Sequence, residues 1–319
     1  MNYRFNVADL ASIETRVAAW LAGCESLTDV FRQGKDAYLD LAVKMYGLPY
    51  DKLSADYEGL NGKEAKIKAK QMRQVAKPGV LGAVYRLGGG QWGTSKDGDK
   101  IKTGLWGYAD NMGVEMTQEQ AHMVVRIFRE AYKEIPEFWY LLENVVGDVM
   151  AGTNTVRYVG PNNCVKIDKI NIEGRNPMMR MQLPSGRYLH YLDARMESCK
   201  MPWKDSTTGE DVYRSALVYA GTNQDTKQWD LWVQTHGGKL FENLVQAIAR
   251  DILSVKLLAA EEKEMEIVGH VHDEGIALVI DDIFSPTTED FIKLMSEPVI
   301  WAPGLLLGAD GFQSTFYHK

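Results

Sequence analysis

The stretch Glu266-Ile-Val-Gly-His-Val-His-Asp-Glu-Gly-Ile-Ala-Leu-Val-Ile280 decides the fold of this chain. Two apolar runs, Ile267 to Val271 and Ile276 to Ile280, flank the segment His272-Asp273-Glu274-Gly275. This pattern predicts a strand, a tight turn and a second strand. Carboxylates in such a turn would be held rigidly and close together, as a divalent metal requires if it is to bind a phosphate.

The composition is that of an ordinary globular protein: 319 residues, of which 45% are hydrophobic and 25% charged. It suffices for one large or two medium domains. The chain has no apolar run long enough to span a membrane and no signal peptide at its N-terminus, so we expect no membrane partner and a cytoplasmic location. Cys24, Cys164 and Cys199 are far apart and odd in number, which argues against a disulfide framework or a zinc site. A net charge of −7 argues against a protein that coats nucleic acid, although it leaves room for local basic patches.

A second acidic position lies near the start of the chain. Tyr3 to Leu10 reads as a buried strand that carries Asp9 at its end, and Ser12 is a candidate N-cap for a helix that follows. If this strand pairs with the late hairpin, Asp9 and Asp273 meet at one sheet edge. Two neighbouring carboxylates repel each other unless cations lie between them. Two Mg²⁺ ions about 3.5–4 Å apart would then suit phosphoryl transfer. In the alternative interpretation, Asp9 caps the helix.

The order of the remaining patterns predicts an α+β fold. The first strand and the late hairpin would share one antiparallel sheet. Short alternating runs between residues 153 and 236 predict a β-rich antiparallel insertion. Helical patterns occupy residues 13–21, 27–33, 36–46, 63–85, 118–133, 136–150, 240–263 and 287–295.

The predicted helix at residues 63–85 is strongly basic. Arg73, Lys77, Leu81 and Tyr85 recur at a spacing of four, which would place them in a slowly turning stripe on one side of the helix. Arginine can form a two-point contact with phosphate, lysine adds a point charge and tyrosine offers a ring for stacking. Pro78 is compatible with this helix if the rigid part begins near Arg73. The alternative is a solvated basic face.

Three segments, in this order along the chain, together resemble the family A DNA polymerases, which include bacterial DNA polymerase I and phage replicative enzymes. Asp9-Leu-Ala-Ser-Ile-Glu-Thr-Arg16 is similar to their motif A, Arg73-x3-Lys77-x7-Tyr85 to motif B, and Val271-His-Asp-Glu274 to motif C. Further segments are similar to members of the family: Tyr132–Trp139, Leu183–Arg187 and Gly237–Asp251.

The resemblance implies a role for each matching residue. Asp9 and Asp273 would hold two Mg²⁺ ions with help from the Leu10 carbonyl, and Glu274 would be a secondary acid near the primer end. Glu14 would lie under the sugar and exclude a 2′-hydroxyl.

The fingers helix would bind the nucleotide. Arg73 and Lys77 would clamp the triphosphate, and Lys77 could protonate the departing pyrophosphate. Leu81 replaces an aromatic residue of the family, so packing on the incoming sugar would differ. Tyr85 would stack at the template position. The implied DNA contacts come from Tyr85, Gln246 and His272.

Three further positions depart from the family pattern. Ala11 replaces the serine of motif A, which removes a hydroxyl but no metal ligand. Arg86 replaces a glycine, and Tyr38 stands where bacterial members often have a histidine near the phosphates.

The implied fold is the right-hand palm, an antiparallel sheet, with mostly helical fingers. The palm would comprise residues 1–21 and 237–319, the fingers 22–152 and the β-rich insertion 153–236. The thumb would be absent from this chain.

The implied function is DNA-templated deoxynucleotidyl transfer in DNA replication, by the C-terminal half of a family A enzyme. Its partners would be primer–template DNA, deoxynucleoside triphosphates and a separate N-terminal polymerase fragment.

Three alternatives remain open at this point. The chain could be a catalytically inactive remnant or DNA-binding accessory module, or a relative of the single-subunit RNA polymerases. His270 and His272 could also bind a metal, although the segment offers no third soft ligand.

Overall fold

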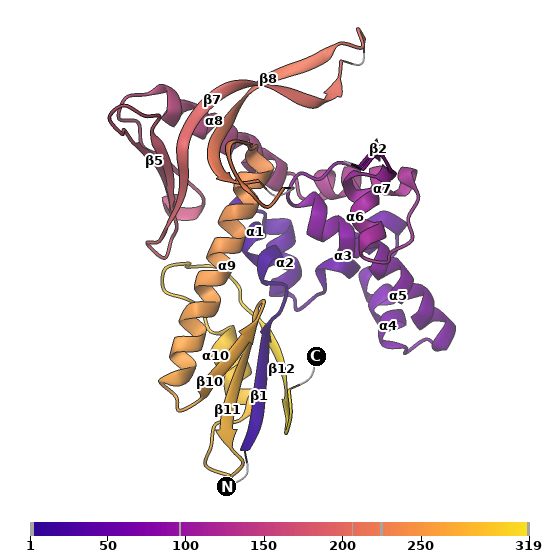
Figure 1. Ribbon diagram of the computed structural model, residues 1–319. Coiled ribbons are helices and arrows are strands. Elements are labelled where there is room, and N and C mark those ends of the chain that lie inside the picture. The colour runs from indigo at the N-terminus through magenta and orange to yellow at the C-terminus, as the bar shows by residue number, and fades with distance from the viewer. Residues whose placement is uncertain (1–2, 96, 206, 224–225, 318–319) are drawn as a thin grey trace.

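A computed structural model describes residues 3–95, 97–205, 207–223 and 226–317. A four-stranded antiparallel sheet forms one end of the molecule, with the strand order β10-β11-β1-β12 (Figure 1). The predicted pairing of the first strand with the late hairpin is therefore confirmed. The strands are β1 (Tyr3–Leu10), β10 (Glu266–Val271), β11 (Glu274–Ile280) and β12 (Ala309–Ser314).

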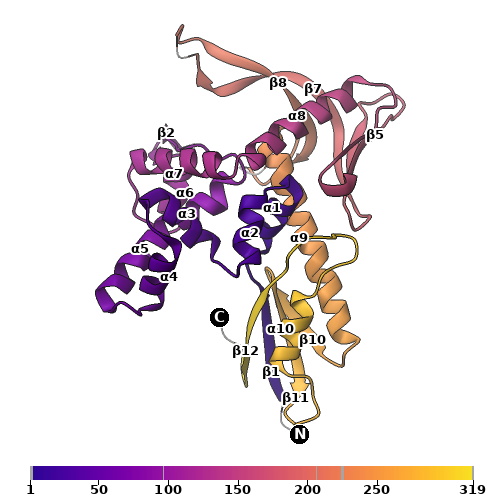
Figure 2. The ribbon, with the colours of Figure 1, turned by 180° about the vertical axis from the view of Figure 1, so that it is seen from behind.

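Two helices, α9 (Gly237–Glu261) and α10 (Thr288–Ser296), cover one face of this sheet. Figure 2 shows α10 lying against the strands. Gly275 and Gly311 both lie opposite Ala8 of the central strand, and a Cβ added at Gly275 would meet α9 and α10 side chains at 2.6 and 2.9 Å. Because side chains alternate along a strand, the residues next to these positions face the other, uncovered side of the sheet.

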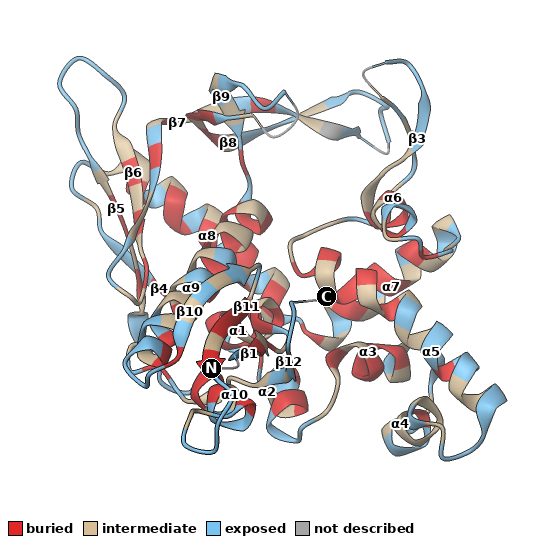
Figure 3. Ribbon diagram, turned by 60° about the horizontal axis from the view of Figure 1, so that its bottom comes forward, coloured by how far each residue is buried: buried red, intermediate tan, exposed pale blue. Residues whose placement is uncertain are grey.

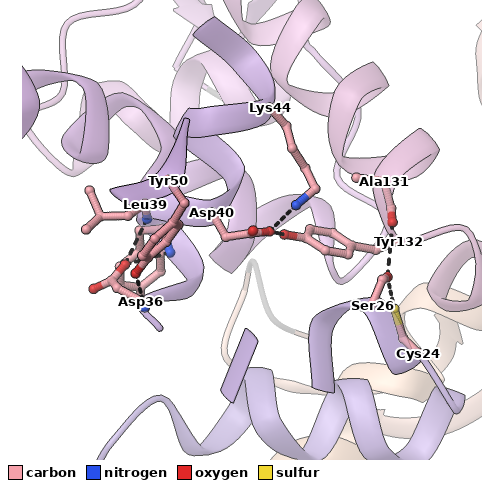
Figure 4. A network of polar contacts seen from close by, with 10 residues as sticks. Cys24, Ser26, Asp36, Leu39, Asp40, Lys44, Tyr50, Ala131 and Tyr132 are labelled. Carbon is pink, nitrogen blue, oxygen red and sulfur yellow. Dashed lines mark hydrogen bonds and ion pairs between the residues drawn. The ribbon is translucent and has the colours of Figure 1, made fainter. Parts of the chain in front are cut away.

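A helical lobe lies beside the sheet. Tyr132, just after α7, donates a hydrogen bond of 2.6 Å to Asp40 of α3, and Lys44 forms an ion pair with the same carboxylate (Figure 4). This contact ties the end of α7 to α3. The helices before the insertion are α1 (Ile13–Ala22), α2 (Glu25–Arg32), α3 (Ala37–Tyr46), α4 (Tyr50–Glu58), α5 (Lys63–Pro78), α6 (Gly104–Asn111), α7 (Gln118–Ala131) and α8 (Glu134–Ala151), with a small ribbon of β2 (Trp92–Thr94) and β3 (Lys100–Lys102). Of these helices, α1 and α8 pack against α9.

The basic helix differs from its prediction. The α-helix begins at Lys63 and ends at Pro78, and a π-helix, Gly79–Ala83, continues the chain. Proline has no N–H to donate and its ring crowds the preceding turn, so the regular ladder does not continue past it. The wider π-helical turn takes up the change. The predicted even stripe is therefore interrupted between Lys77 and Leu81.

The predicted β-rich insertion is a six-stranded antiparallel sheet whose strands follow one another in chain order. Its two longest strands, β7 and β8, reach beyond the predicted runs and project from the body as a hairpin (Figure 1). Much of this hairpin is exposed, whereas the inward sides of the helices are buried (Figure 3). The strands are β4 (Arg157–Val159), β5 (Val165–Ile170), β6 (Met178–Gln182), β7 (Tyr188–Lys204), β8 (Asp211–Thr222) and β9 (Trp229–Gln234).

Within the described ranges, no helix combines the length and the apolar character needed to cross a lipid bilayer. The three cysteines are free thiols, and burial raises the pKa of Cys24 to about 11. The expectation of no disulfide framework agrees with this structure.

Candidate active site

The paired strands bring Asp9 and Asp273 to one cleft. The Leu10 N–H donates a hydrogen bond of 3.1 Å to the Asp273 carbonyl, and both carboxylate residues line a cavity of about 720 Å³. The turn is shorter than predicted: only His272 and Asp273 lie in it, and Glu274 already begins β11. His272 adopts a left-handed φ of 55°, as a two-residue hairpin turn requires.

Asp9 does not cap a helix. It lies within β1, and the N-cap position of α1 is taken by Ser12. Ser12 itself has a φ of 53° and forms no side-chain cap hydrogen bond, so its predicted position is right but its predicted capping role is wrong. The helix-cap alternative for Asp9 is therefore excluded.

Three acidic residues form a row across the sheet. Asp9 lies directly opposite Glu274 on β11 and directly opposite Asp310 on β12. Directly opposed residues share a face, which here is the face not covered by α9 and α10. Glu274 is buried and accepts a hydrogen bond of 2.9 Å from the Tyr317 hydroxyl. Asp310 was not anticipated, because no motif marks it and only the strand register brings it to Asp9.

Glu14 and Tyr85 meet across the cleft. The Tyr85 hydroxyl donates a hydrogen bond of 2.6 Å to Glu14 Oε2, although the two residues are 71 positions apart. Burial raises the pKa of Tyr85, and the charge of Glu14 raises it further, so the hydroxyl remains a donor at neutral pH. The bond fixes the Glu14 carboxylate at the junction between α1 and the end of the π-helix.

Arg73 and Lys77 do not line this cleft. Arg73 forms an ion pair of 2.7 Å with Asp36, and its guanidinium lies 4.8 Å from the centre of the Tyr38 ring. Tyr38 does line the cleft, so a single side chain separates Arg73 from it. Asp36 is anchored as the N-cap of α3 (Figure 4).

The remaining predicted residues border the same region. Leu81, Tyr85 and Gln246 line the main cleft, and His272 lines an adjoining hollow of about 380 Å³ that also includes Gln246 and Asp273. Leu10 is buried beneath Asp9. The sequence did not single out several further lining residues, which converge only through folding: Tyr108, His236, Lys239, Glu242 and Arg250.

Few side chains in the cleft could serve as metal ligands. Among the described residues, no group of three or more histidine, cysteine, aspartate or glutamate side chains could hold a metal ion. Two carboxylates still suit Mg²⁺, since this ion commonly takes one or two carboxylates and completes its shell with water and phosphate oxygens. The histidine alternative gains no support, because His270 lies 3.3 Å from an Arg250 guanidinium nitrogen rather than beside a third ligand.

One comparison with known proteins, to a phage relative, agrees with the motifs. No model of a protein family matches the chain. A DNA polymerase of Bacillus phage SP02 is 32% identical over 317 residues, or 99% of this chain, and the chain spans 41% of that relative's length. This relative confirms the predicted resemblance to a DNA polymerase. A solved structure titled the POL domain of Pol1 from M. smegmatis, in complex with DNA primer-template and dNTP, is 13% identical with a TM-score of 0.49, covering 98% of this chain and 39% of that one.

Proposed function

We propose that this chain is the portion of a family A DNA polymerase that carries its palm and fingers and catalyses DNA-templated deoxynucleotidyl transfer. The observation that supports this most strongly is the convergence of Asp9, Glu14, Tyr85 and Asp273 on one cleft from segments far apart in the sequence. Similarity to a phage DNA polymerase along 99% of the chain points to the same activity.

The palm in this proposal comprises residues 1–21 and 237–319, built on the four-stranded sheet. Residues 22–152 form the fingers and 153–236 an insertion. Since the chain spans 41% of its relative's length, we propose that a thumb-bearing N-terminal fragment completes the duplex-binding site. The reaction would take place in the cytoplasm of an infected bacterium.

The proposed reaction is in-line attack of a primer 3′-hydroxyl on the α-phosphate of a deoxynucleoside triphosphate. Two Mg²⁺ ions held by Asp9, Asp273 and the Leu10 carbonyl would supply Lewis acidity at the phosphate and at the attacking hydroxyl. Glu274, buried beside Asp9, would orient groups near the primer end.

The fingers residues would position the nucleotide. Glu14, fixed by its hydrogen bond to Tyr85, would exclude a 2′-hydroxyl sterically and electrostatically. Arg73 and Lys77 would bind the triphosphate, and Lys77 would donate a proton to the departing pyrophosphate. Because neither of these two residues lines the cleft here, substrate binding would have to bring the π-helix and α5 inward. Gln246 and His272 would contact the primer–template beside Asp273.

Primer extension tests the proposal. The chain is mixed with the polypeptide encoded immediately upstream, and extension of a labelled primer is followed with and without Mg²⁺. We expect Mg²⁺-dependent extension that Asp273→Asn abolishes. No extension by any mixture, or extension that survives Asp273→Asn, would overturn the proposal in favour of a non-catalytic DNA-binding module.

A further inference from the structure

A second cavity, of about 520 Å³, adjoins the active-site cleft. Arg86 and His236 border both hollows, so the two lie side by side. The far wall of the second cavity belongs to the insertion, since residues of β7 and β8 line it. Its near wall comes from α7, α8 and the start of α9. The insertion therefore contributes to a site that adjoins the candidate active-site cleft.

The lining of this cavity is positively charged. Arg86, Arg129 and Arg214 all border it, and Glu143 is its one acidic lining residue. Glu143 forms an ion pair with Arg86. Within the described part of the chain, neither Arg129 nor Arg214 forms an ion pair, so two of the three positive charges are not balanced by a carboxylate. A cavity of this kind suits a polyanion.

Arg129 supports this interpretation through its geometry. Its Nε atom is buried and, among the described residues, has no hydrogen-bond partner, while its Nη2 donates to the Leu87 carbonyl at 3.4 Å. Burial lowers the pKa of Arg129, the charge of Tyr140 raises it, and the charge of Arg86 lowers it. Among the described residues no carboxylate balances this partly buried charge, and a phosphate bound beside the guanidinium would supply the counter-charge.

The same cavity offers a surface on which a base can stack. Trp203 of β7 lines it with 44% of its surface exposed, and the Arg214 guanidinium lies 5.7 Å from the centre of its ring. Met196, Met201 and Leu217 add apolar area. Aromatic rings and arginines along a cationic groove are how proteins bind single-stranded nucleic acid without reading its sequence.

The position of the cavity indicates which strand it would hold. Tyr85, proposed to stack at the template position, lines the cleft, and the next residue, Arg86, borders both the cleft and the second cavity. We propose that this cavity binds the single-stranded template immediately ahead of the base being copied, with phosphates on Arg129 and Arg214 and a base on Trp203. This inference rests on the proposed function and gives the insertion a role in holding the template.

The first experiment measures binding of the chain to a labelled single-stranded oligodeoxynucleotide of about 12 nucleotides, within the range of single-strand sites. Arg214→Ala and Trp203→Ala are compared with Arg175→Ala and Trp229→Ala. The control pair has the same residue types in the same insertion but borders a separate hollow. All four side chains are exposed at the surface, so truncating them should leave folding intact.

We expect Trp203→Ala to weaken binding about tenfold through lost stacking. Arg214→Ala should weaken it and reduce the slope of log affinity against log salt by about 0.7, the value for one lost phosphate contact on a single strand. The control variants should stay within about twofold of the unmodified chain. Equal effects from both pairs, or no binding of the oligonucleotide by the unmodified chain, would overturn the inference.

The second experiment separates this inference from the proposed function. Extension is measured on templates whose single-stranded overhang is one nucleotide or several nucleotides long. We expect Arg214→Ala and Trp203→Ala to slow extension on the longer overhang and to leave the single-nucleotide overhang unaffected. If extension requires Asp273 but is unchanged by both substitutions, the proposal that this cavity binds the template is wrong and the proposed polymerase activity stands. If the expected binding pattern is found but no extension occurs, the proposed polymerase activity is wrong and the single-strand site stands.

Discussion

Arg73 and Asp36 form a two-point contact in which both Nε and Nη2 of the arginine donate to the same carboxylate oxygen, at 3.1 and 2.7 Å. The other oxygen of Asp36 accepts hydrogen bonds from the backbone N–H groups of Tyr38 and Leu39. One oxygen of Asp36 therefore caps α3. The other accepts both hydrogen bonds from Arg73, the residue proposed to bind the triphosphate. A nucleotide would have to compete with Asp36 for Arg73.

Asp36→Asn should strengthen nucleotide binding. Asparagine keeps the capping oxygen but removes the charge that holds Arg73. The pair is partly exposed, so the gain should be at most about fivefold, corresponding to about 1 kcal/mol. The apparent KM for deoxynucleotide in primer extension measures it. Asp110→Asn, which breaks the Lys102–Asp110 ion pair elsewhere in the helical lobe, is the matched control and should leave the KM unchanged.

Asp9→Asn should abolish extension without destabilising the fold. Loss of a carboxylate that is proposed to bind Mg²⁺ should lower the extension rate by more than about 100-fold, since even outer partners of metal ligands can cost that much. The free energy of unfolding should stay level or rise, because Asp9 lies between Glu274 and Asp310 and like charges directly opposed in a sheet repel. Primer extension measures the expected loss of activity, and urea unfolding measures the expected free energy of unfolding. Asp51→Asn on α4 serves as the control, and a marked loss of stability in Asp9→Asn would point to a structural role instead.

Glu14→Ala should admit ribonucleotides. Removing the carboxylate opens space under the sugar, and we expect discrimination against ribonucleotides to fall at least about tenfold. The ratio of kcat/KM for matched deoxy- and ribonucleotides measures this. Tyr85→Phe keeps the ring but releases Glu14, so it should cause a smaller loss in the same direction. Because the pKa of Tyr85 is raised, discrimination by the unmodified chain should not change between neutral pH and about pH 9.

Much of the central sheet could be predicted from the sequence because its signals are local. The apolar runs around Asp273 and before Asp9 give the strands, and the helical pattern at residues 118–133 corresponds to α7, which begins with a capping box at Thr117. The juxtaposition of Asp9 with Asp273 followed from pairing those strands.

Other features depend on contacts that no local pattern encodes. The π-helix after Pro78 changes the direction in which Leu81 and Tyr85 point relative to Arg73, and the i+4 spacing alone gave an unbroken stripe. Asp310 joins the acidic row only through the register of β12. The ion pair between Arg73 and Asp36 joins residues 37 positions apart, and no local sequence pattern indicates that these two residues meet.

Asp168→Asn should destabilise the insertion. Asp168 is buried between Lys166 and Arg180, with hydrogen bonds of 2.8 Å from two Arg180 nitrogens. Leaving these cations without their carboxylate should cost about 1–3 kcal/mol of unfolding free energy, reduced from the fully buried case because both partners are partly exposed. Asp148→Asn breaks the exposed Arg157–Asp148 pair and should cost less than about 0.5 kcal/mol. Thermal unfolding of the two variants provides the comparison.

The contacts of Asp168 with Lys166 and Arg180 also predict that the free energy of unfolding falls at low pH. Burial alone would raise the pKa of Asp168, but hydrogen bonds and charges from Arg180 and Lys166 outweigh it and lower the pKa below its ordinary value of 3.8. A lowered pKa stabilises the folded state above the unfolded carboxyl pKa of about 4, and that stability is lost as the pH falls through the lowered value. Unfolding at pH 3 should therefore be shifted less by Asp168→Asn than unfolding at pH 7.

The central strand β1 has a consequence for how the molecule is made. Its neighbours on either side, β11 and β12, come after the helical lobe and the insertion in the chain, so β1 stays unpaired while both of these leave the ribosome. Pairings between such distant segments form slowly, since the entropy cost of closing a long loop comes before any stabilising contact forms. The helical lobe and the insertion can each fold during synthesis from local contacts. The acidic row can thus assemble only after the helical lobe and the insertion have been made, and a nascent chain released before β11 would present folded outer elements without this row.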